Sequence, residues 1–224
     1  MKQSRFHRIY EKGKRRKKLF TKNLTPGKTV YDESVINENN LEYREWNPKR
    51  SKLAASILKG INKIGIEKGS IVLYLGASSG TTVSHVSDIV GEEGFVFAVE
   101  FAPRMMRDLV FVCEDRKNIA PMLYDANKPE EYKDKMTEKV DIVYMDIAQR
   151  NQAEIFLKNV DMFLKKEGVG LLAVKARSVN VVEKPFKIFK QVREKLERNL
   201  NVIDYKLLSP FQKDHCMFVV KKWE

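Results

Sequence analysis

The sequence predicts an α/β fold in which a mostly parallel sheet is covered by helices on both faces. Beyond residue 50, apolar strand-like runs alternate with stretches of helical periodicity, a pattern typical of parallel strands buried on both sides. The chain then finishes on two closely spaced apolar runs, which indicates an antiparallel hairpin at one edge of the sheet. Residues 1–50 are polar, basic and β-prone. We therefore expect a small β-rich N-terminal domain at 1–50 and an α/β domain at 51–224.

The composition narrows the class of protein. A chain of 224 residues is long enough for one full α/β domain and a small appendage. Hydrophobic residues make up 43% and charged residues 32%, which excludes a wholly disordered chain. Two cysteines, Cys113 and Cys216, are too few for a disulfide scaffold. Cys216 lies in an apolar run, and we expect it in the core.

No segment of the sequence is typical of secretion or of a membrane span. The N-terminus lacks the apolar stretch of a secretory signal, and no run approaches the ~18 apolar residues that a spanning helix needs. We therefore expect a soluble, intracellular protein, located in the cytoplasm.

The positive charge is concentrated at the two ends of the chain. The net charge is +12; residues 1–50 hold 14 Lys/Arg and 6 Asp/Glu, residues 51–174 hold 16 and 18, and residues 175–224 hold 12 and 6. If the two ends meet, they form a surface for a polyanion around the nearly neutral middle. The run 12–18 contains six basic residues, and two interpretations stay open: a solvated loop or strand edge, or direct contact with RNA.

The first elements are expected to be short strands, because β-prone residues alternate with turn formers such as Pro26-Gly27. These strands lie at 6–10, 18–21, 29–31 and 41–46. From residue 51 the pattern becomes helical, with Ser51 as a candidate N-cap. The helical periodicity covers Leu53, Ala54, Ile57, Leu58, Ile61 and Ile64.

Strands and helices then alternate along the rest of the chain. The expected strands lie at 71–75, 95–99, 119–124, 140–145, 169–174, 202–208 and 216–220, which makes a seven-stranded sheet. The expected helices lie at 81–90, 103–114, 151–165 and 185–199. Pro103 suits the first turn of its helix. The last helix is basic and amphipathic, with Phe186, Phe189, Val192 and Leu196 facing inward.

The strongest local motif is Gly76-Ala77-Ser78-Ser79-Gly80-Thr81-Thr82, which follows the first sheet strand and opens a helix. Small residues let a ligand approach the backbone, and helix N–H groups attract polar or anionic groups. The motif is not a Walker A loop, because no Gly-Lys-Ser/Thr follows. It is not G-x-G-x-x-G either, which argues against a nicotinamide-dependent dehydrogenase. A simple tight turn is the plain alternative.

Three carboxylates follow successive strands near this motif. Glu100, Asp125 and Asp146 each end a predicted strand, and ligands of open α/β sheets bind beyond these carboxyl ends. Each of them alone could be a helix cap. Together with the glycine segment they favour a ligand that contains adenosine and a positively charged part. The absence of a phosphate-binding lysine disfavours ATP and favours S-adenosylmethionine.

Two further residues are candidates for chemistry. Lys175 closes an apolar strand at the predicted ligand edge, and His215 lies at the turn into the last strand. The plain alternatives are an exposed strand-end lysine and a structural histidine. The sequence shows no Cys/His cluster at zinc spacing.

In combination these residues resemble the fibrillarin family, in its short archaeal form. The resemblance extends from Tyr43 to the C-terminus, and the Gly/Arg-rich tail of eukaryotic members is absent. In order, the blocks that carry it are Arg44-Glu45-Trp46-Asn47-Pro48, Arg50-Ser51-Lys52-Leu53-Ala54-Ala55, Tyr74 to Thr82, Ser84-His85-Val86-Ser87-Asp88, Glu100-Phe101-Ala102-Pro103-Arg104, Asp125-Ala126-Asn127, Asp146-Ile147-Ala148-Gln149, Val174-Lys175-Ala176-Arg177-Ser178 and Asp214-His215. Arg150 departs from the pattern, because many relatives have proline at this position.

The resemblance implies a Rossmann-like class I methyltransferase fold and S-adenosylmethionine-dependent methylation of ribose 2′-hydroxyls in rRNA and tRNA. It implies a ribonucleoprotein with a box C/D guide RNA, a Nop-family scaffold protein and a kink-turn-binding protein, in which base pairing chooses the target. No metal is implied. The family's catalytic set maps onto Lys52, Asp146, Lys175 and His215. Its cofactor positions map onto Gly76, Ala77, Thr81, Thr82, Glu100, Phe101, Asp125, Ala126, Asp146 and Gln149.

The hypothesis for the roles follows from the reaction. A ribose 2′-OH is a poor nucleophile, so it must be aligned with the methyl group and then lose its proton. Lys175 is expected to accept the proton or stabilise the alkoxide, and Asp146 to fix the lysine and the methionine end of the cofactor. Two alternatives stay open: a stand-alone RNA or protein methyltransferase, and a structural ribonucleoprotein subunit without catalysis.

Overall fold

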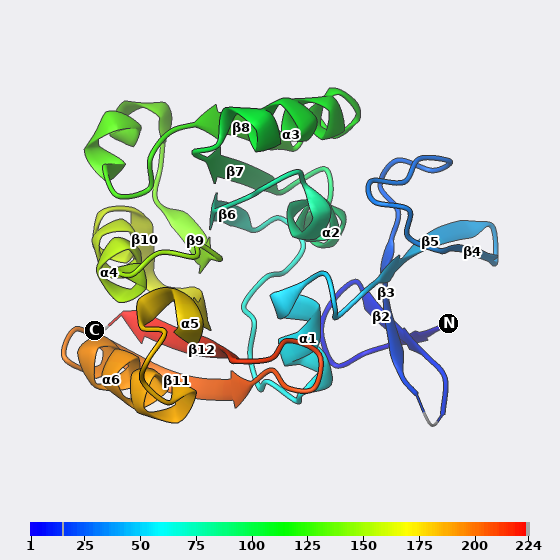
Figure 1. Ribbon diagram of the computed structural model, residues 1–224. Helices are drawn as coiled ribbons and strands as arrows, with labels where there is room; N and C mark the ends of the chain where they lie inside the picture. The colour runs from blue at the N-terminus through cyan, green and yellow to red at the C-terminus, as the bar shows by residue number, and fades with distance from the viewer. Residues whose placement is uncertain (15, 223–224) are drawn as a thin grey trace.

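The computed structural model describes residues 1–14 and 16–222 and contains two sheets (Figure 1). The N-terminal sheet is antiparallel, with strand order β1-β2-β3-β5-β4. Its strands are β1 (Lys2–Gln3), β2 (Ile9–Lys12), β3 (Lys18–Lys22), β4 (Val35–Glu38) and β5 (Leu41–Trp46). The expected β-rich N-terminal region is thereby confirmed. The strand expected at 29–31 is wrong, because the backbone N–H groups of Val30 and Tyr31 bind the Glu33 carboxylate instead of a neighbouring strand.

The larger sheet has seven strands in the order β11-β12-β10-β9-β6-β7-β8. The strands are β6 (Ile71–Leu75), β7 (Phe95–Glu100), β8 (Ile119–Leu123), β9 (Val140–Met145), β10 (Leu164–Lys175), β11 (Leu200–Leu207) and β12 (His215–Lys222). The pairs from β10 through β8 are parallel. β12 pairs antiparallel with both β10 and β11. The predicted seven-stranded, mostly parallel sheet with an antiparallel hairpin at its edge is confirmed, and β12 is the strand that opposes the others.

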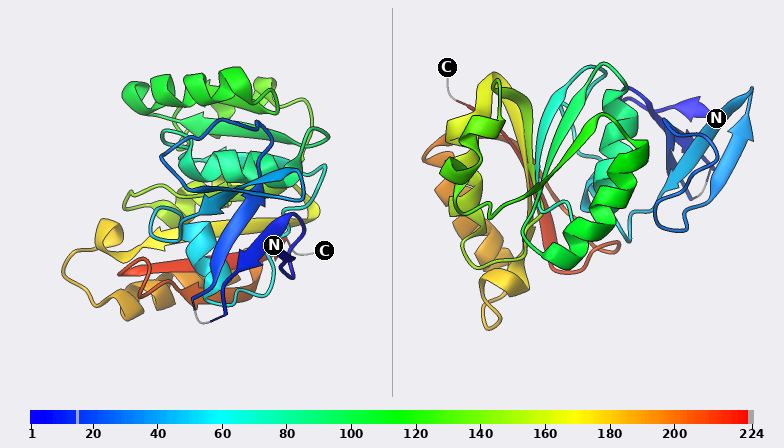
Figure 2. Two further views of the ribbon diagram at one scale, coloured as in Figure 1. Left: turned by 90° about the vertical axis from the view of Figure 1, so that its right-hand side faces the viewer. Right: turned by 90° about the horizontal axis from the view of Figure 1, so that it is seen from above.

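Helices cover both faces of this sheet, as expected (Figure 2). The helices are α1 (Lys52–Leu58), α2 (Thr81–Val90), α3 (Pro103–Asp115), α4 (Gln152–Phe163), α5 (Ala176–Val179) and α6 (Pro185–Glu197). The side chains of β6 alternate between the faces: Val72 and Tyr74 pack with residues of α1, α2 and α3, whereas Leu73 and Leu75 pack with α4 and α6. Within the described residues, none of these helices is both long and apolar enough to cross a bilayer.

Two predictions about helices need correction. The helix expected to run through Ile64 ends at Leu58, because Lys59 caps it and Gly60 takes a left-handed backbone with φ +81°. Ile61 and Ile64 are still buried, although they lie outside the helix. On α6, Phe186 does not face inward; it is 70% exposed, and Ile188 occupies the buried face. The expected helix start is confirmed, since the Ser51 side chain accepts a hydrogen bond from the Ala54 N–H.

The N-terminal sheet docks on α2 through a buried network of charged groups. The Arg44 guanidinium on β5 lies 2.6 Å from Glu33 and 3.0 Å from Asp88 of α2. Arg116 approaches the other oxygen of Asp88 at 2.6 Å. All four side chains are buried, where an ion pair is stable only if its charges are matched and hydrogen-bonded. The network therefore fixes the N-terminal sheet against α2 and the end of α3.

His85 of α2 lies at the centre of the same interface. Its Nδ1 is 2.8 Å from the Thr21 hydroxyl, its Nε2 is 2.6 Å from the Tyr31 hydroxyl, and its ring stacks on Trp46. Burial lowers the pKa of His85 well below the usual value, and the charges of Arg44 and Arg116 lower it further. The imidazole is therefore neutral in the folded protein at pH 7.

Candidate active site

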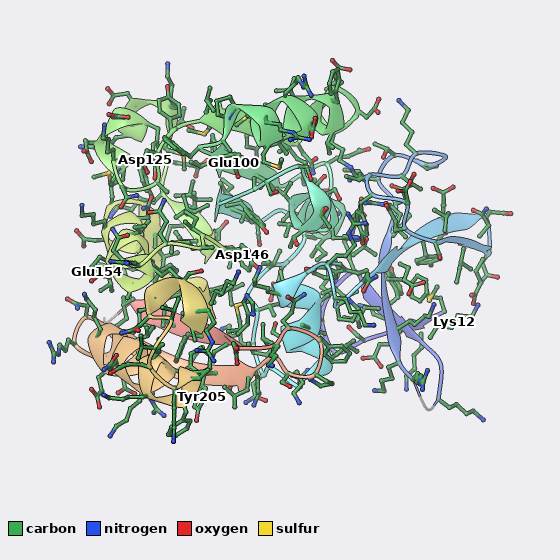
Figure 3. All side chains as sticks on the ribbon, in the orientation of Figure 1. Lys12, Glu100, Asp125, Asp146, Glu154 and Tyr205 are labelled. Carbon is green, nitrogen blue, oxygen red and sulfur yellow. The ribbon has the colours of Figure 1, made fainter. Side chains whose placement is uncertain are left out.

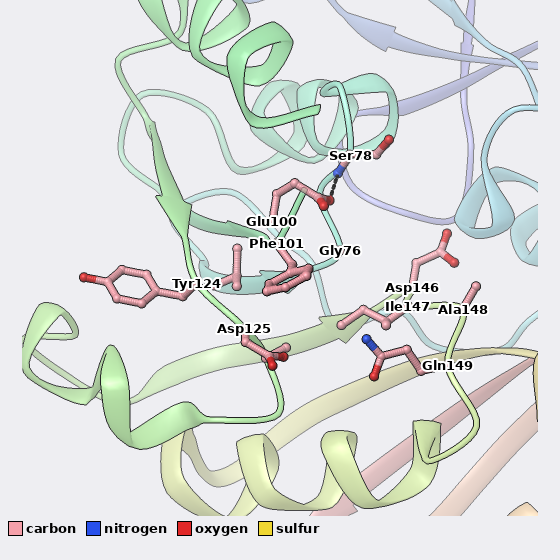
Figure 4. Close-up of a pocket in the computed structure, with 12 residues that line it drawn as sticks. Gly76, Ser78, Glu100, Phe101, Tyr124, Asp125, Asp146, Ile147, Ala148 and Gln149 are labelled. Atoms are coloured by element: carbon pink, nitrogen blue, oxygen red, sulfur yellow. Dashed lines mark hydrogen bonds between the residues drawn. The ribbon is translucent and has the colours of Figure 1, made fainter. Parts of the chain in front are cut away.

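A pocket of about 240 Å³ opens at the carboxyl ends of β6, β7 and β9 (Figure 4). Segments from several strand ends contribute its walls. The lining residues are Gly76, Ser78, Val99, Glu100, Phe101, Tyr124, Asp125, Ala126, Asp146, Ile147, Ala148 and Gln149. Figure 3 shows Glu100, Asp125 and Asp146 around this edge, with Lys12 far away on the N-terminal sheet. The three carboxylates that the sequence placed at strand ends thus meet in one pocket.

Gly76 allows the glycine loop to lie directly against the end of β9. Its φ is +83°, and a Cβ atom there would come within 2.6 Å of the Asp146 carbonyl oxygen and 2.9 Å of Ile147 Cγ1. Because only glycine avoids both the clash and the strained backbone, the residue is required for this close approach. The loop leads into α2 through Gly80.

Glu100 is held in a fixed orientation at the end of β7. Its Oε2 accepts a hydrogen bond of 2.7 Å from the Ser78 N–H, and its Oε1 accepts one of 2.8 Å from the Ala102 N–H. The carboxylate therefore bridges the glycine loop and the start of α3, and each oxygen has a second lone pair for a ligand hydroxyl. Phe101 beside it is 66% exposed and lines the pocket, where its ring is open to a ligand.

Asp125 and Gln149 are joined through Asn127. The Asn127 N–H and side-chain amide donate to Asp125 Oδ1 at 2.9 and 3.0 Å. The same amide nitrogen donates to Gln149 Oε1 at 2.9 Å. These bonds connect the segment after β8 with the segment after β9, so the two walls of the pocket are fixed relative to each other.

Lys52 and Asp146 form an ion pair at the mouth of the pocket. The Lys52 Nζ lies 2.9 Å from both Asp146 oxygens, and each side chain is mostly buried. Lys52 is the first residue of α1, whose N-cap Ser51 accepts a further hydrogen bond of 3.0 Å from the Thr82 hydroxyl. The start of α2 thereby supports the start of α1, and Lys52 reaches the end of β9.

Lys175 and His215 lie opposite each other on β10 and β12. The neighbouring Ala176 N–H donates to the Asp214 carbonyl, and the His215 carbonyl accepts from Leu208 on the other side. Lys175 and His215 are therefore a non-hydrogen-bonded pair, the arrangement in which facing side chains come closest.

His215 is neutral in this environment. Burial lowers its pKa below the usual value, the charges of Lys52 and Lys175 lower it further, and Asp146 and the Lys213 carbonyl oppose them. Its Nδ1 lies 2.6 Å from the Lys213 carbonyl oxygen, which can only accept, so Nδ1 carries the hydrogen and Nε2 has a lone pair for a hydroxyl donor. The charges that shift the pKa of His215 belong to Lys52, Asp146 and Lys175, so all four predicted catalytic residues lie together at one edge of the sheet.

The predicted cofactor positions divide into two groups. Seven line the pocket: Gly76, Glu100, Phe101, Asp125, Ala126, Asp146 and Gln149. The other three, Ala77, Thr81 and Thr82, do not line it; Ala77 in the loop and Thr82 in α2 are buried. Their part in cofactor binding stays a prediction. Five lining residues were not predicted as cofactor positions: Ser78, Val99, Tyr124, Ile147 and Ala148. Each is an immediate chain neighbour of one that was, and Ser78, Ile147 and Ala148 lie in the quoted motifs.

The chain is similar throughout its length to known proteins. The Fibrillarin family model matches residues 1–224. The "Fibrillarin-like rRNA/tRNA 2′-O-methyltransferase" of Methanococcus voltae is 54% identical over 204 residues, which cover 91% of this chain and 89% of the relative.

Two solved structures share the fold and much of the sequence. Aeropyrum pernix fibrillarin, crystallised with natively bound S-adenosyl-L-methionine, has a TM-score of 0.90 at 44% identity and covers 98% of this chain and 96% of its own. The matching chain of a fibrillarin/Nop5p complex has a TM-score of 0.89 at 39% identity and covers 99% of this chain and 100% of its own. With its full length matched and more than half of the aligned residues shared with a curated relative, this chain belongs to the fibrillarin family.

Proposed function

We propose that this protein transfers methyl groups from S-adenosylmethionine to ribose 2′-hydroxyls of rRNA and tRNA, as the catalytic subunit of a box C/D guide ribonucleoprotein. The observation that carries the proposal is the convergence of Lys52, Asp146, Lys175 and His215 beside a pocket lined by three carboxylates. The curated relative bears the name of this activity. We place the activity in the cytoplasm, because the relatives are archaeal proteins named for rRNA and tRNA.

The residues of the pocket fit the proposed cofactor. S-adenosylmethionine supplies an electrophilic methyl group on a positively charged sulfonium. Glu100 would accept hydrogen bonds from the ribose hydroxyls of the cofactor, and Asp125 would face its adenine end. Backbone N–H groups already hold these two carboxylates in place. Asp146 and Gln149 would hold the methionine end. The exposed Phe101 ring would cover the nucleoside.

Three basic side chains beside the pocket then act on the RNA: Lys52, Lys175 and His215. His215 Nε2 accepts a hydrogen bond from the 2′-OH and orients it, because the neutral imidazole has a lone pair on this atom. Lys175 accepts the proton or stabilises the developing alkoxide. Lys52, held by Asp146, orients the neighbouring phosphate. Aligning the hydroxyl with the methyl group accounts for several kcal/mol of the barrier, up to roughly 7–11 kcal/mol in ideal cases.

The partners are part of the proposal. A related chain was crystallised with Nop5p, which supports a Nop-family scaffold protein as a partner. The guide RNA and the kink-turn-binding protein complete the assembly, and base pairing with the guide would choose the target nucleotide. In this arrangement the protein itself reads ribose and phosphate rather than base sequence.

The test is methyl transfer from labelled S-adenosylmethionine to a target RNA, with and without the guide RNA and the two partner proteins. The control RNA carries a 2′-deoxyribose at the guided position. We expect label on one ribose, only in the complete complex and not in the deoxy control. Label without partners would instead indicate a stand-alone enzyme. No label despite cofactor binding and complete assembly would indicate a structural subunit.

A further inference from the structure

Gln152, the first residue of α4, has a side chain that is polar and almost fully buried, with 1% of its surface exposed. Its amide makes three hydrogen bonds, all to backbone atoms of functional segments. Oε1 accepts from the Lys175 N–H at 3.1 Å, and Nε2 donates to the carbonyl oxygens of Gln149 at 2.7 Å and Lys175 at 3.3 Å. A single side chain thus contacts the backbone of the predicted catalytic lysine and that of the cofactor segment.

The course of the sheet explains why Lys175 needs this side chain. In the non-hydrogen-bonded pair with His215, the N–H and C=O groups of Lys175 point away from β12 and toward the β9 side. The last register partner of β10 on that side is Met145, which faces Leu172. β9 therefore no longer reaches Lys175. The Gln152 amide replaces the missing strand by offering one acceptor and one donor to the same residue.

The third bond of Gln152 connects this strand end to the pocket. The Gln149 carbonyl that it binds belongs to a residue whose side chain accepts from Asn127, which in turn binds Asp125. A chain of hydrogen bonds, continued through the covalent frame of Gln149, consequently connects Asp125 in the pocket to the backbone of Lys175. A shift in either segment would strain the other through Gln152.

We propose that Gln152 is a positioning residue that sets the distance between the Lys175 side chain and the bound cofactor. This inference rests on the proposed function for its catalytic consequence. Gln152 touches neither reactant, and it acts by fixing the backbone of Lys175 and of Gln149 in one frame. Displacement of a reacting group by about 1 Å can lower a rate on the order of 100-fold, so a loose Lys175 would slow methyl transfer without removing any reacting group.

The test uses the full chain in the reconstituted guide complex. Gln152→Met keeps the volume of the side chain and removes all three hydrogen bonds, whereas Gln152→Glu keeps the acceptor and removes the donors. We expect the single-turnover rate of methyl transfer to fall about tenfold or more in both variants, because Gln152→Glu places a buried carboxylate oxygen against two carbonyl oxygens. The dissociation constant for S-adenosylmethionine, measured by calorimetry, should change by no more than about threefold.

The matched control is Asn118→Leu. Asn118 is also a buried amide that donates to two backbone carbonyls, those of Ser87 and Gly91, but it lies outside the pocket. We expect this variant to lose thermal stability to a similar degree and to keep the wild-type rate within about twofold. An equal fall in rate for Asn118→Leu, or a wild-type rate for a folded Gln152→Met, would overturn the proposal. If Gln152→Met does not fold, an unchanged rate in Gln152→Glu overturns it in the same way.

Amide hydrogen exchange separates this proposal from the proposed function, because it needs no activity. In the isolated protein, exchange of the Lys175 N–H should become about tenfold faster or more in Gln152→Met, while exchange of the Val174 N–H stays unchanged. Unaltered protection at Lys175 would show that Gln152 does not hold this backbone. A wild-type complex that transfers no methyl group would refute the proposed function instead, and leave the exchange result to decide on Gln152.

Discussion

Lys52 and Asp146 form one ion pair between the first turn of α1 and the end of β9, with the Lys52 Nζ equally close to both carboxylate oxygens, at 2.9 Å. The pair brings together an element that directly follows the N-terminal sheet and a strand from the centre of the large sheet. Because both side chains are mostly shielded from water, neither can leave the pair without exposing the other as a poorly solvated charge.

Removing the negative charge of Asp146 is expected to slow methyl transfer. Asp146→Asn releases Lys52 and takes a negative charge from the pocket, and a lost charge-assisted hydrogen bond of about 1.5–3 kcal/mol corresponds to a rate reduction of about 10- to 100-fold. Single-turnover methyl transfer in the guide complex measures it. The control is Glu154→Gln, which breaks the exposed pair with Lys195 and should leave the rate unchanged. A wild-type rate in Asp146→Asn would contradict the assignment.

The loss of Lys175 is expected to affect chemistry rather than binding. Lys175→Ala should abolish methyl transfer, because the group that faces His215 is removed, and the affinity for S-adenosylmethionine should stay within a few-fold of wild type, because Lys175 does not line the pocket. Calorimetry and single-turnover kinetics on one preparation give both values. Lys166, an exposed lysine near the other end of β10, provides the control variant Lys166→Ala. Preserved turnover in Lys175→Ala would refute its role as proton acceptor.

The buried network at the sheet interface is expected to dominate the stability of the N-terminal region. Arg44→Met leaves Glu33 and Asp88 without the guanidinium that now lies between them, and breaking a buried pair in this way costs about 3–5 kcal/mol. Urea unfolding measures the loss. Lys18→Met, which removes the exposed pair with Glu45 on the same sheet, should cost no more than about 1 kcal/mol. Equal losses in the two variants would show that burial of the network is irrelevant.

Buried, neutral His85 is expected to make the protein less stable in mild acid. Its pKa in the folded protein lies well below the usual 6.5, so below pH 6.5 the unfolded chain binds a proton that the folded protein does not. The free energy of unfolding then falls as the pH falls, by up to about 1.4 kcal/mol per pH unit for this group. Urea unfolding of wild type and His85→Gln between pH 7 and 5.5 should give a shallower dependence for the variant. Identical slopes would exclude His85 as the source.

Much of the sheet could be predicted because its signal is local. The expected ranges 71–75, 81–90 and 140–145 coincide with β6, α2 and β9, since unbroken apolar runs and helical spacing are properties of short segments. The prediction of a helix through Ile64 was wrong, because the spacing of apolar residues is also only a local signal. An apolar residue can be buried in a loop as well as in a helix, and periodicity does not distinguish the two. The prediction that Phe186 faces inward was wrong because Ile188, rather than Phe186, continues the buried stripe that contains Val192 and Leu196.

The candidate site was predictable where residues end strands, and not where it depends on tertiary pairing. Glu100, Asp125 and Asp146 could be placed at one edge from strand direction alone. The meeting of Lys175 with His215 requires β12 to lie beside β10 in reverse direction, which no local pattern specifies, so their joint role came from the family resemblance. The burial of Arg44 and Asp88 could not be predicted from the sequence, because burial of a charge is decided by partners distant in the chain.

The position of β12 between β10 and β11 also determines what this edge of the sheet depends on. Within the described residues β11 pairs with β12 alone, so it is attached to the rest of the sheet through β12, whether it docks after β12 or together with it as a hairpin. Docking of β12 on β10 closes a long loop, which is the slow kind of step in folding. The same ladder ends at Lys175 and His215. Assembly of the reactive edge and completion of the sheet are therefore one cooperative event, and a folding intermediate without β12 would lack both.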